Sequence, residues 1–203
     1  RKCPKCEAPY NYTTEKKCSR CSSETHETRK VSFIDAPGHE TLMATVIAAS
    51  SIMDGALFVI SANEKCPQPQ TLEHLMVLEA SKIKNIVIAQ NKVDLVSKAR
   101  ALESYKEIRE FLKGSSYADA PIVPTAALSP ESLRPLIGAV EESIPTPKRD
   151  VSAEPQMFIA RSFDVNKPGS PIPRIVGGVM GGSIVRGTLR VGDEVEISPG
   201  VLK

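Results

Sequence analysis

The sequence is poor in aromatic residues: tryptophan is absent and the aromatic fraction is only 4%. Because 41% of the residues are nevertheless hydrophobic, we expect a core built mostly from Val, Ile, Leu and Ala. The formal net charge is only +2, so the overall charge does not identify a nucleic-acid-binding protein. Any RNA-binding surface would have to come from a local arrangement of basic side chains.

Long apolar runs are missing as well. No run approaches the roughly 20 residues of a membrane-spanning helix, and the charged start at Arg1 lacks the apolar segment of a signal peptide. We therefore expect a cytoplasmic protein with no membrane partner. The five cysteines are an odd number in a sequence without a secretion signal, which argues against a disulfide framework.

Four short apolar runs alternate with longer segments of helical periodicity. The runs lie at 31–34, 55–60, 85–89 and 121–124. The clearest helical segment is 97–113, and 71–83 and 131–143 have similar spacing. Continuous apolar strands that alternate with helices indicate a parallel sheet covered on both faces. The sequence therefore predicts an α/β fold, a doubly wound parallel-sheet domain.

The periodicity changes at 145–155, where prolines and charged residues indicate an interdomain linker. Beyond it, glycines separate short apolar segments, and we expect strands at 157–161, 175–179, 183–185 and 194–197. This pattern is typical of an all-β barrel, here incomplete. The predicted parts are a cysteine-rich insert, an α/β domain and the start of a β-barrel, at 1–29, 30–148 and 149–203.

Four of the cysteines form the pattern Cys3-x2-Cys6-x11-Cys18-x2-Cys21. Four thiolates at this spacing can surround a tetrahedral zinc ion, as in a zinc knuckle. Such a site carries about two net negative charges. Nearby basic side chains can offset this charge and favour thiolates: Lys2, Lys5, Lys16, Lys17 and Arg20. Redox-active C-x-x-C pairs and free thiols are the alternatives.

The pentapeptide Asp35-Ala36-Pro37-Gly38-His39 follows the first apolar run. A carboxylate at a strand end can hold magnesium, directly or through water, which predicts Asp35 as a ligand. Gly38 offers a backbone N–H with no side chain in the way of a terminal phosphate. His39 can position a water molecule against that phosphate. The alternative is a tight Pro-Gly turn with a solvated histidine.

Two further loops follow apolar runs. In Asn91-Lys92-Val93-Asp94, the Asp94 carboxylate can accept hydrogen bonds from guanine N1–H and its 2-amino group, a pattern that adenine lacks. Lys92 can lay its aliphatic stem over the base, and Asn91 can bond neighbouring loops and the purine edge. The alternative here is a polar β-to-α turn.

The last of these loops is Thr125-Ala126-Ala127-Leu128, whose small residues let a backbone N–H reach guanine O6. Taken alone, this segment is typical of an ordinary strand-end loop. It indicates a nucleotide site only because it follows D-x-x-G and N-K-x-D in order, each at a strand end. Together the loops predict a GTP or GDP site. Its predicted residues are Asp35, Gly38, Asn91, Lys92, Val93, Asp94, Ala126, Ala127 and Leu128.

The D-A-P-G-H form and the segment 68–71 resemble the translational GTPases. The cysteine pattern before D-x-x-G, together with 161–169 and 177–184, resembles the gamma subunits of archaeal and eukaryotic translation initiation factor 2. The resemblance implies a GTP hydrolase with His39 as the catalytic residue, using magnesium and zinc. It also implies, as partners, the alpha and beta subunits of a heterotrimer, initiator methionyl-tRNA and the small ribosomal subunit.

The sequence departs from that family in several places. It has no G-x-x-x-x-G-K-[ST] phosphate loop and no first switch with its magnesium-binding threonine, and Ala126 stands where the family has serine. We therefore expect a fragment, also lacking the third domain, that does not bind or hydrolyse GTP normally alone. Two alternatives remain: a selenocysteine-specific or general elongation GTPase, and a non-catalytic zinc-binding assembly module.

Overall fold

The computed structural model describes residues 1–36, 38, 46–47, 50 and 52–198. The chain forms two compact units, Arg1–Thr146 and Pro147–Lys203. Among the described residues, no helix has the length and apolarity needed to cross a membrane.

The larger unit contains a three-stranded parallel sheet in the order β1-β2-β3. Its strands are β1 (Ala56–Ser61), β2 (Ile86–Asn91) and β3 (Ile122–Pro124). Its helices are α2 (Pro69–Ala80), α3 (Lys98–Leu112) and α4 (Pro130–Ser143), with a short 3-10 helix, η2 (Val93–Leu95), after β2. Three of the four expected strands and all three expected helices are therefore confirmed.

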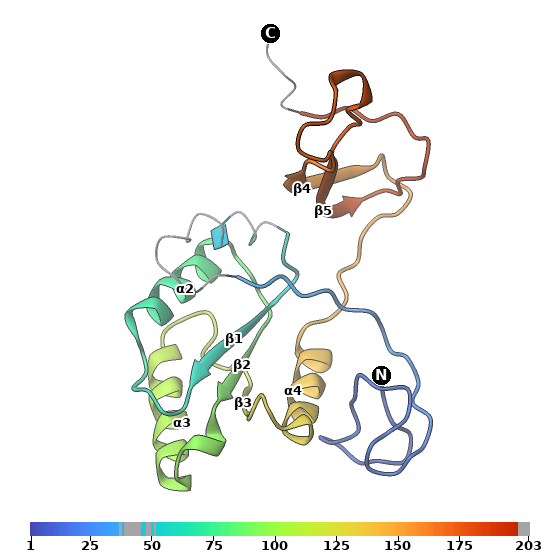
Figure 1. Cartoon of the computed structure of the whole chain (residues 1–203). Coiled ribbons are helices and arrows are strands. Elements are labelled where there is room, and N and C mark those ends of the chain that lie inside the picture. The colour runs from blue at the N-terminus through green and yellow to red at the C-terminus, as the bar shows by residue number, and fades with distance from the viewer. Residues whose placement is uncertain (37, 39–45, 48–49, 51, 199–203) are drawn as a thin grey trace. The chain divides into compact units, whose positions relative to one another are not determined.

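The central strand β2 shows why the fold has helices on both faces of the sheet. Ile86 and Ile88 point into one apolar cluster, whereas Val87 and Ala89 point into another, as the two-residue period of a strand requires. The first cluster is completed by α2 and α3, and the second by α4. Figure 1 shows α2 and α3 on one side of the sheet and α4 on the other. The predicted α/β fold is confirmed.

Helix boundaries follow local signals in the sequence. The Ser97 side chain accepts a hydrogen bond from Arg100 N at 3.2 Å and caps the start of α3. Helices α2 and α4 each begin at a proline, whose missing N–H is no loss in the first turn. On α3, Ser104, Ile108 and Leu112 are buried at four-residue intervals, so one stripe of the helix faces the core.

The strand expected at 31–34 is not formed. These residues have no regular secondary structure, and Phe33 is 75% exposed. A strand needs a neighbouring strand for its backbone N–H and C=O groups, and apolar side chains alone do not supply one. The apolar run was therefore a misleading signal at this position.

The smaller unit contains two antiparallel strands, β4 (Gln156–Phe163) and β5 (Val179–Arg186), and a short 3-10 helix, η3 (Ile172–Arg174). The strands expected at 175–179 and 194–197 are wrong except for Val179, which opens β5. At Val176 the reason is local: its N–H and C=O both bond the Asn166 side-chain amide, at 3.0 Å each. This amide takes the place of a neighbouring strand.

Candidate nucleotide site and metal centre

Two of the three predicted nucleotide loops lie side by side. Strands β2 and β3 are parallel neighbours, with Gln90 opposite Pro124, so the loops that follow them leave the same edge of the sheet. Ala127 N donates to Asn91 Oδ1 at 3.1 Å, and Val93 N donates to Thr125 O at 3.3 Å. These two bonds hold the loops 91–94 and 125–128 together.

The side chains predicted to read the base are open to solvent. Lys92 and Asp94 are exposed, on either side of Val93, where η2 begins. Lys92 has a φ of 61°, in the left-handed region that non-glycine residues seldom adopt. Such a conformation costs about 1–3 kcal/mol and persists where surrounding bonds impose it. The loop thus presents its two charged side chains to solvent.

Helix α4 fixes the backbone of the third loop. The Ser132 hydroxyl donates to Ala126 O at 2.7 Å and accepts from Ala126 N at 3.0 Å. Ala126 is buried, whereas the Leu128 side chain is 94% exposed. The Ala127 N–H, which the sequence leaves available for a guanine oxygen, here donates to Asn91. The loop is thus braced by the first turn of α4 on one side and by the 91–94 loop on the other.

The residues predicted to meet the phosphate and magnesium do not form a comparable group. Asp35 and Gly38 are exposed in a segment without helix or strand, rather than at a strand end. A Cβ placed on Gly38 would meet no atom within 4 Å. His39 lies outside the described residues.

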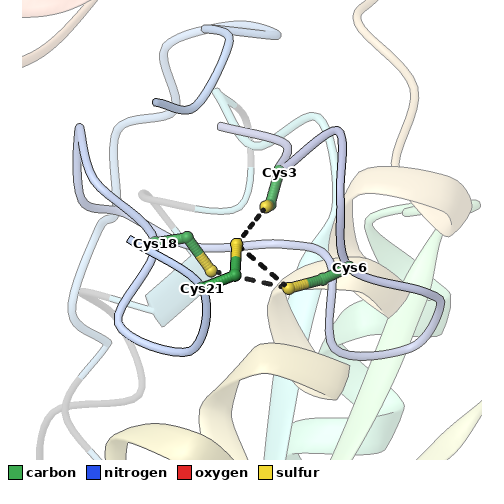
Figure 2. A group of neighbouring side chains, drawn as sticks. All are labelled: Cys3, Cys6, Cys18 and Cys21. Carbon is green, nitrogen blue, oxygen red and sulfur yellow. Dashed lines mark hydrogen bonds between the residues drawn. The ribbon is translucent and has the colours of Figure 1, made fainter. Parts of the chain in front are cut away.

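The four paired cysteines converge on one point, as Figure 2 shows. All four sulfur atoms lie within 4.8 Å of one another. The sulfur pairs Cys3–Cys21, Cys6–Cys18 and Cys6–Cys21 are 3.4, 3.6 and 3.8 Å apart. A disulfide requires about 2.05 Å, whereas zinc bonds of about 2.3 Å in a tetrahedron place the sulfurs about 3.8 Å apart. The arrangement therefore fits a four-coordinate metal ion and not two disulfides.

Short backbone bonds position these sulfurs. Cys3 N donates to Asn11 O at 2.7 Å, and Cys18 N donates to Ser23 O at 2.9 Å, so each C-x-x-C turn is closed by its own loop. Burial opposes ionisation of Cys18, but hydrogen bonds from the backbone N–H groups of Cys21 and Arg20, together with those from the Cys6 and Cys3 thiols, lower the pKa of this thiol to about 6. Burial and the hydrogen bond to Cys18 in turn raise the pKa of Cys6 to about 12. At Cys18 the turn thus favours the thiolate form that binds metals.

The contacts of α4 were missed by sequence reasoning. Its helical periodicity is visible, but nothing marks Ser132 or Arg134 as more than members of an amphipathic helix. In the structure Arg134 is buried, and its guanidinium donates to Tyr10 O and to Cys18 Sγ. The only signal was an arginine at a position that the helical spacing places near the buried face.

The family described as the elongation factor Tu GTP binding domain matches residues 7–146. The chain belongs to this family. The loops 91–94 and 125–128 both lie within the matched residues.

Several curated relatives of the chain bear the name translation initiation factor 2 subunit gamma. The protein from Methanothermobacter thermautotrophicus is 58% identical over 99% of this chain and 49% of its own length. Those from Archaeoglobus fulgidus and Pyrococcus horikoshii are 57% and 56% identical over 99% of this chain and 47% and 48% of their lengths. The chain thus spans about half the length of these relatives.

Solved structures of the elongation factor SelB from Methanococcus maripaludis are similar in fold. The apo form gives a TM-score of 0.65 at 27% identity, covering 88% of this chain and 38% of that chain. The complex with the GTP analogue GppNHp gives 0.64 at 27% identity, covering 78% and 34%.

Proposed function

We propose that this chain provides the guanine-recognition part of a GTP-hydrolysing translation initiation factor subunit. The observation that carries the proposal is the bonded pair of loops 91–94 and 125–128 in a chain 58% identical to a translation initiation factor 2 gamma subunit. The elongation-factor alternative is weaker, because the SelB structures share only 27% identity. The intact protein would deliver initiator methionyl-tRNA to the small ribosomal subunit in the cytoplasm, together with alpha and beta subunits.

Within this proposal, each loop has a separate role. Asp94 accepts hydrogen bonds from the guanine N1–H and 2-amino groups, and Lys92 covers the base plane with its stem. Asp35 would hold magnesium, and the Gly38 backbone N–H would be available to the terminal phosphate. His39 orients the attacking water. GTP hydrolysis requires magnesium and the γ-phosphate of the nucleotide. The residues of this chain orient the base and the attacking water.

The decisive experiment substitutes Asp94, the residue proposed to recognise guanine. In the intact protein, Asp94→Asn replaces an acceptor by a group that is partly a donor, so GTP and GDP should bind more weakly and xanthosine nucleotides should bind better. Titration with fluorescent guanosine and xanthosine diphosphates measures both effects. Asp119→Asn is the matched control, because this exposed aspartate precedes β3 at the opposite end of the strand. Unchanged guanosine nucleotide affinity in Asp94→Asn contradicts the role given to Asp94. If the unsubstituted intact protein binds no nucleotide at all, the non-catalytic assembly module is favoured instead.

We also propose that residues 1–29 form a zinc knuckle with one zinc ion on Cys3, Cys6, Cys18 and Cys21, inserted in a GTP-binding domain at 30–148, and that 149–203 begin a β-barrel domain. The sulfur separations of 3.4–3.8 Å support the metal site. Metal analysis of the purified chain should find about one zinc per chain, as a four-thiolate site requires. A native disulfide between Cys3 and Cys6, or between Cys18 and Cys21, would exclude the site.

A further inference from the structure

A single arginine of the α/β domain is buried against the cysteine loops. Arg134 lies in the second turn of α4 and is only 3% exposed. Its Nη1 donates to Tyr10 O at 3.0 Å and lies 3.5 Å from Tyr12 O, and its Nη2 donates to the Ser19 hydroxyl. Burying a charge is costly unless its donors are satisfied and its charge is paired. The backbone and hydroxyl oxygens satisfy the donors but are neutral.

The charge of Arg134 therefore needs an anion. One is Glu131, whose carboxylate accepts from Arg134 Nε at 3.2 Å but whose side chain is 51% exposed. The other is the sulfur of Cys18, which is buried and lies 3.7 Å from Arg134 Nη1. A metal ion of charge +2 on four thiolates leaves a net charge of about −2 on the cluster. The guanidinium thus lies against a cluster whose net negative charge a fixed positive charge would offset.

We propose that Arg134 is a positioning residue of the metal centre: it donates to the Cys18 thiolate, offsets the charge of the cluster and fastens the cysteine loops to α4. This inference rests on the proposed zinc site. Groups that hydrogen-bond a metal ligand from outside orient it and tune its donor strength, and their loss commonly weakens metal affinity about 10–100-fold. A lysine cannot replace this arginine fully, because one ammonium does not reach the sulfur, the carbonyl and the hydroxyl as the planar fork does.

A second arginine, Arg29, contacts α4 and serves as the control. Arg29 donates from Nε to Glu141 Oε2 at 2.8 Å and from Nη2 to Val140 O at 3.3 Å. Both acceptors lie on α4. The pair is partly buried, with the Arg29 side chain 18% exposed and the Glu141 side chain 21% exposed. Arg29 stands eight positions beyond Cys21 in the sequence, and its bonds go to the last turns of α4. Removing it loosens the attachment of this segment without removing the donor to Cys18.

The test compares Arg134→Met, Arg134→Lys and Arg29→Met in the 203-residue chain loaded with zinc or cobalt(II). Competition with a colorimetric chelator gives the zinc dissociation constant, and the thiolate-to-cobalt absorption band reports the electron density on the sulfurs. We expect zinc affinity to fall about 10–100-fold in Arg134→Met, to fall less in Arg134→Lys, and to stay unchanged in Arg29→Met. The cobalt band should shift only in the two Arg134 variants.

The outcomes separate this inference from the metal site itself. If the unsubstituted chain binds neither zinc nor cobalt, the proposed zinc site fails and the inference fails with it. If the chain binds metal and Arg134→Met has the same affinity and the same cobalt band, the site stands and the role of Arg134 is overturned. Should Arg134→Met not fold, as judged by circular dichroism, Arg134→Lys decides the question: affinity and band equal to those of the unsubstituted chain overturn the inference. A loss that Arg29→Met reproduces would also overturn it, because attachment alone would then explain the effect.

Discussion

The hydrogen bond between Asn91 and Ala127 predicts how much the two nucleotide loops depend on one another. Asn91→Ala removes the acceptor of the Ala127 N–H, now 3.1 Å from Asn91 Oδ1. Both partners are neutral and Ala127 is exposed, so the loss is that of an ordinary hydrogen bond, about 1 kcal/mol. In the intact protein this corresponds to about fivefold weaker GDP binding if the bond is needed to present the loop to the base. Fluorescence titration with a labelled GDP measures the change.

A second measurement needs no nucleotide. Hydrogen exchange of the Ala127 amide in the 203-residue chain should accelerate in Asn91→Ala, because the side-chain bond is the protection that the substitution removes. Asn63→Ala is the matched control, since Asn63 follows β1 and its Oδ1 accepts from the Ser61 hydroxyl instead. Equal Ala127 exchange in Asn91→Ala and the unsubstituted chain would refute the coupling of the loops. A fall in affinity as large in Asn63→Ala would show that the effect is not specific to the bonded pair.

Three further outcomes follow from the structure. Leu112→Ala should lower the free energy of unfolding by about 2–5 kcal/mol in urea titrations, because Leu112 is fully buried; Leu102→Ala on the same helix, 56% exposed, should have much less effect. Hydrogen bonds from Arg100 lower the pKa of Glu107. The contribution of this pair to the free energy of unfolding is therefore complete above about pH 4.3, the usual glutamate pKa, and is lost as pH falls through the lowered pKa. Arg100→Met should therefore unfold more easily in urea at neutral pH, and the difference from the unsubstituted chain should shrink in acid to what the Arg100 bond to Glu64 O contributes. In the intact protein His39→Ala should slow GTP hydrolysis in the assembled initiation complex about 10²–10⁴-fold with little change in GTP affinity, because a water-orienting group acts mainly in the transition state.

The central strand β2 was predictable because it is buried on both faces. A strand such as β2, with Val87 and Ile88 both fully buried on opposite faces, must read as a continuous apolar run. The run at 31–34 reads the same way but is exposed, because periodicity reports the side chains and not the partner strand. Val176 shows the converse, since a side-chain amide ten positions earlier takes the hydrogen bonds that a strand would need.

The convergence of the four cysteines could be predicted from their spacing, because each C-x-x-C turn brings two sulfurs together. The contacts that support it could not. Arg134 and Cys18 are 116 positions apart, and Asn91 and Ala127 are 36 apart. Sequence patterns locate which face of an element is buried, but they do not say which distant segment covers it. These long-range polar contacts could therefore not be predicted from the sequence and were found only in the structure.

Helix α4 unites the two candidate sites. Its residue Ser132 binds the backbone of Ala126 in the predicted guanine loop, and Arg134, two positions later, binds the cysteine loops at Cys18. Glu131, one position before Ser132, accepts hydrogen bonds from both Arg134 Nε and the Ser19 hydroxyl. One rigid helical turn thus holds the loop that follows β3 and the loops that hold the sulfurs. Ser132 and Arg134 are two positions apart, so α4 provides a direct structural connection between the cysteine cluster and the edge of the sheet from which the loops 91–94 and 125–128 leave.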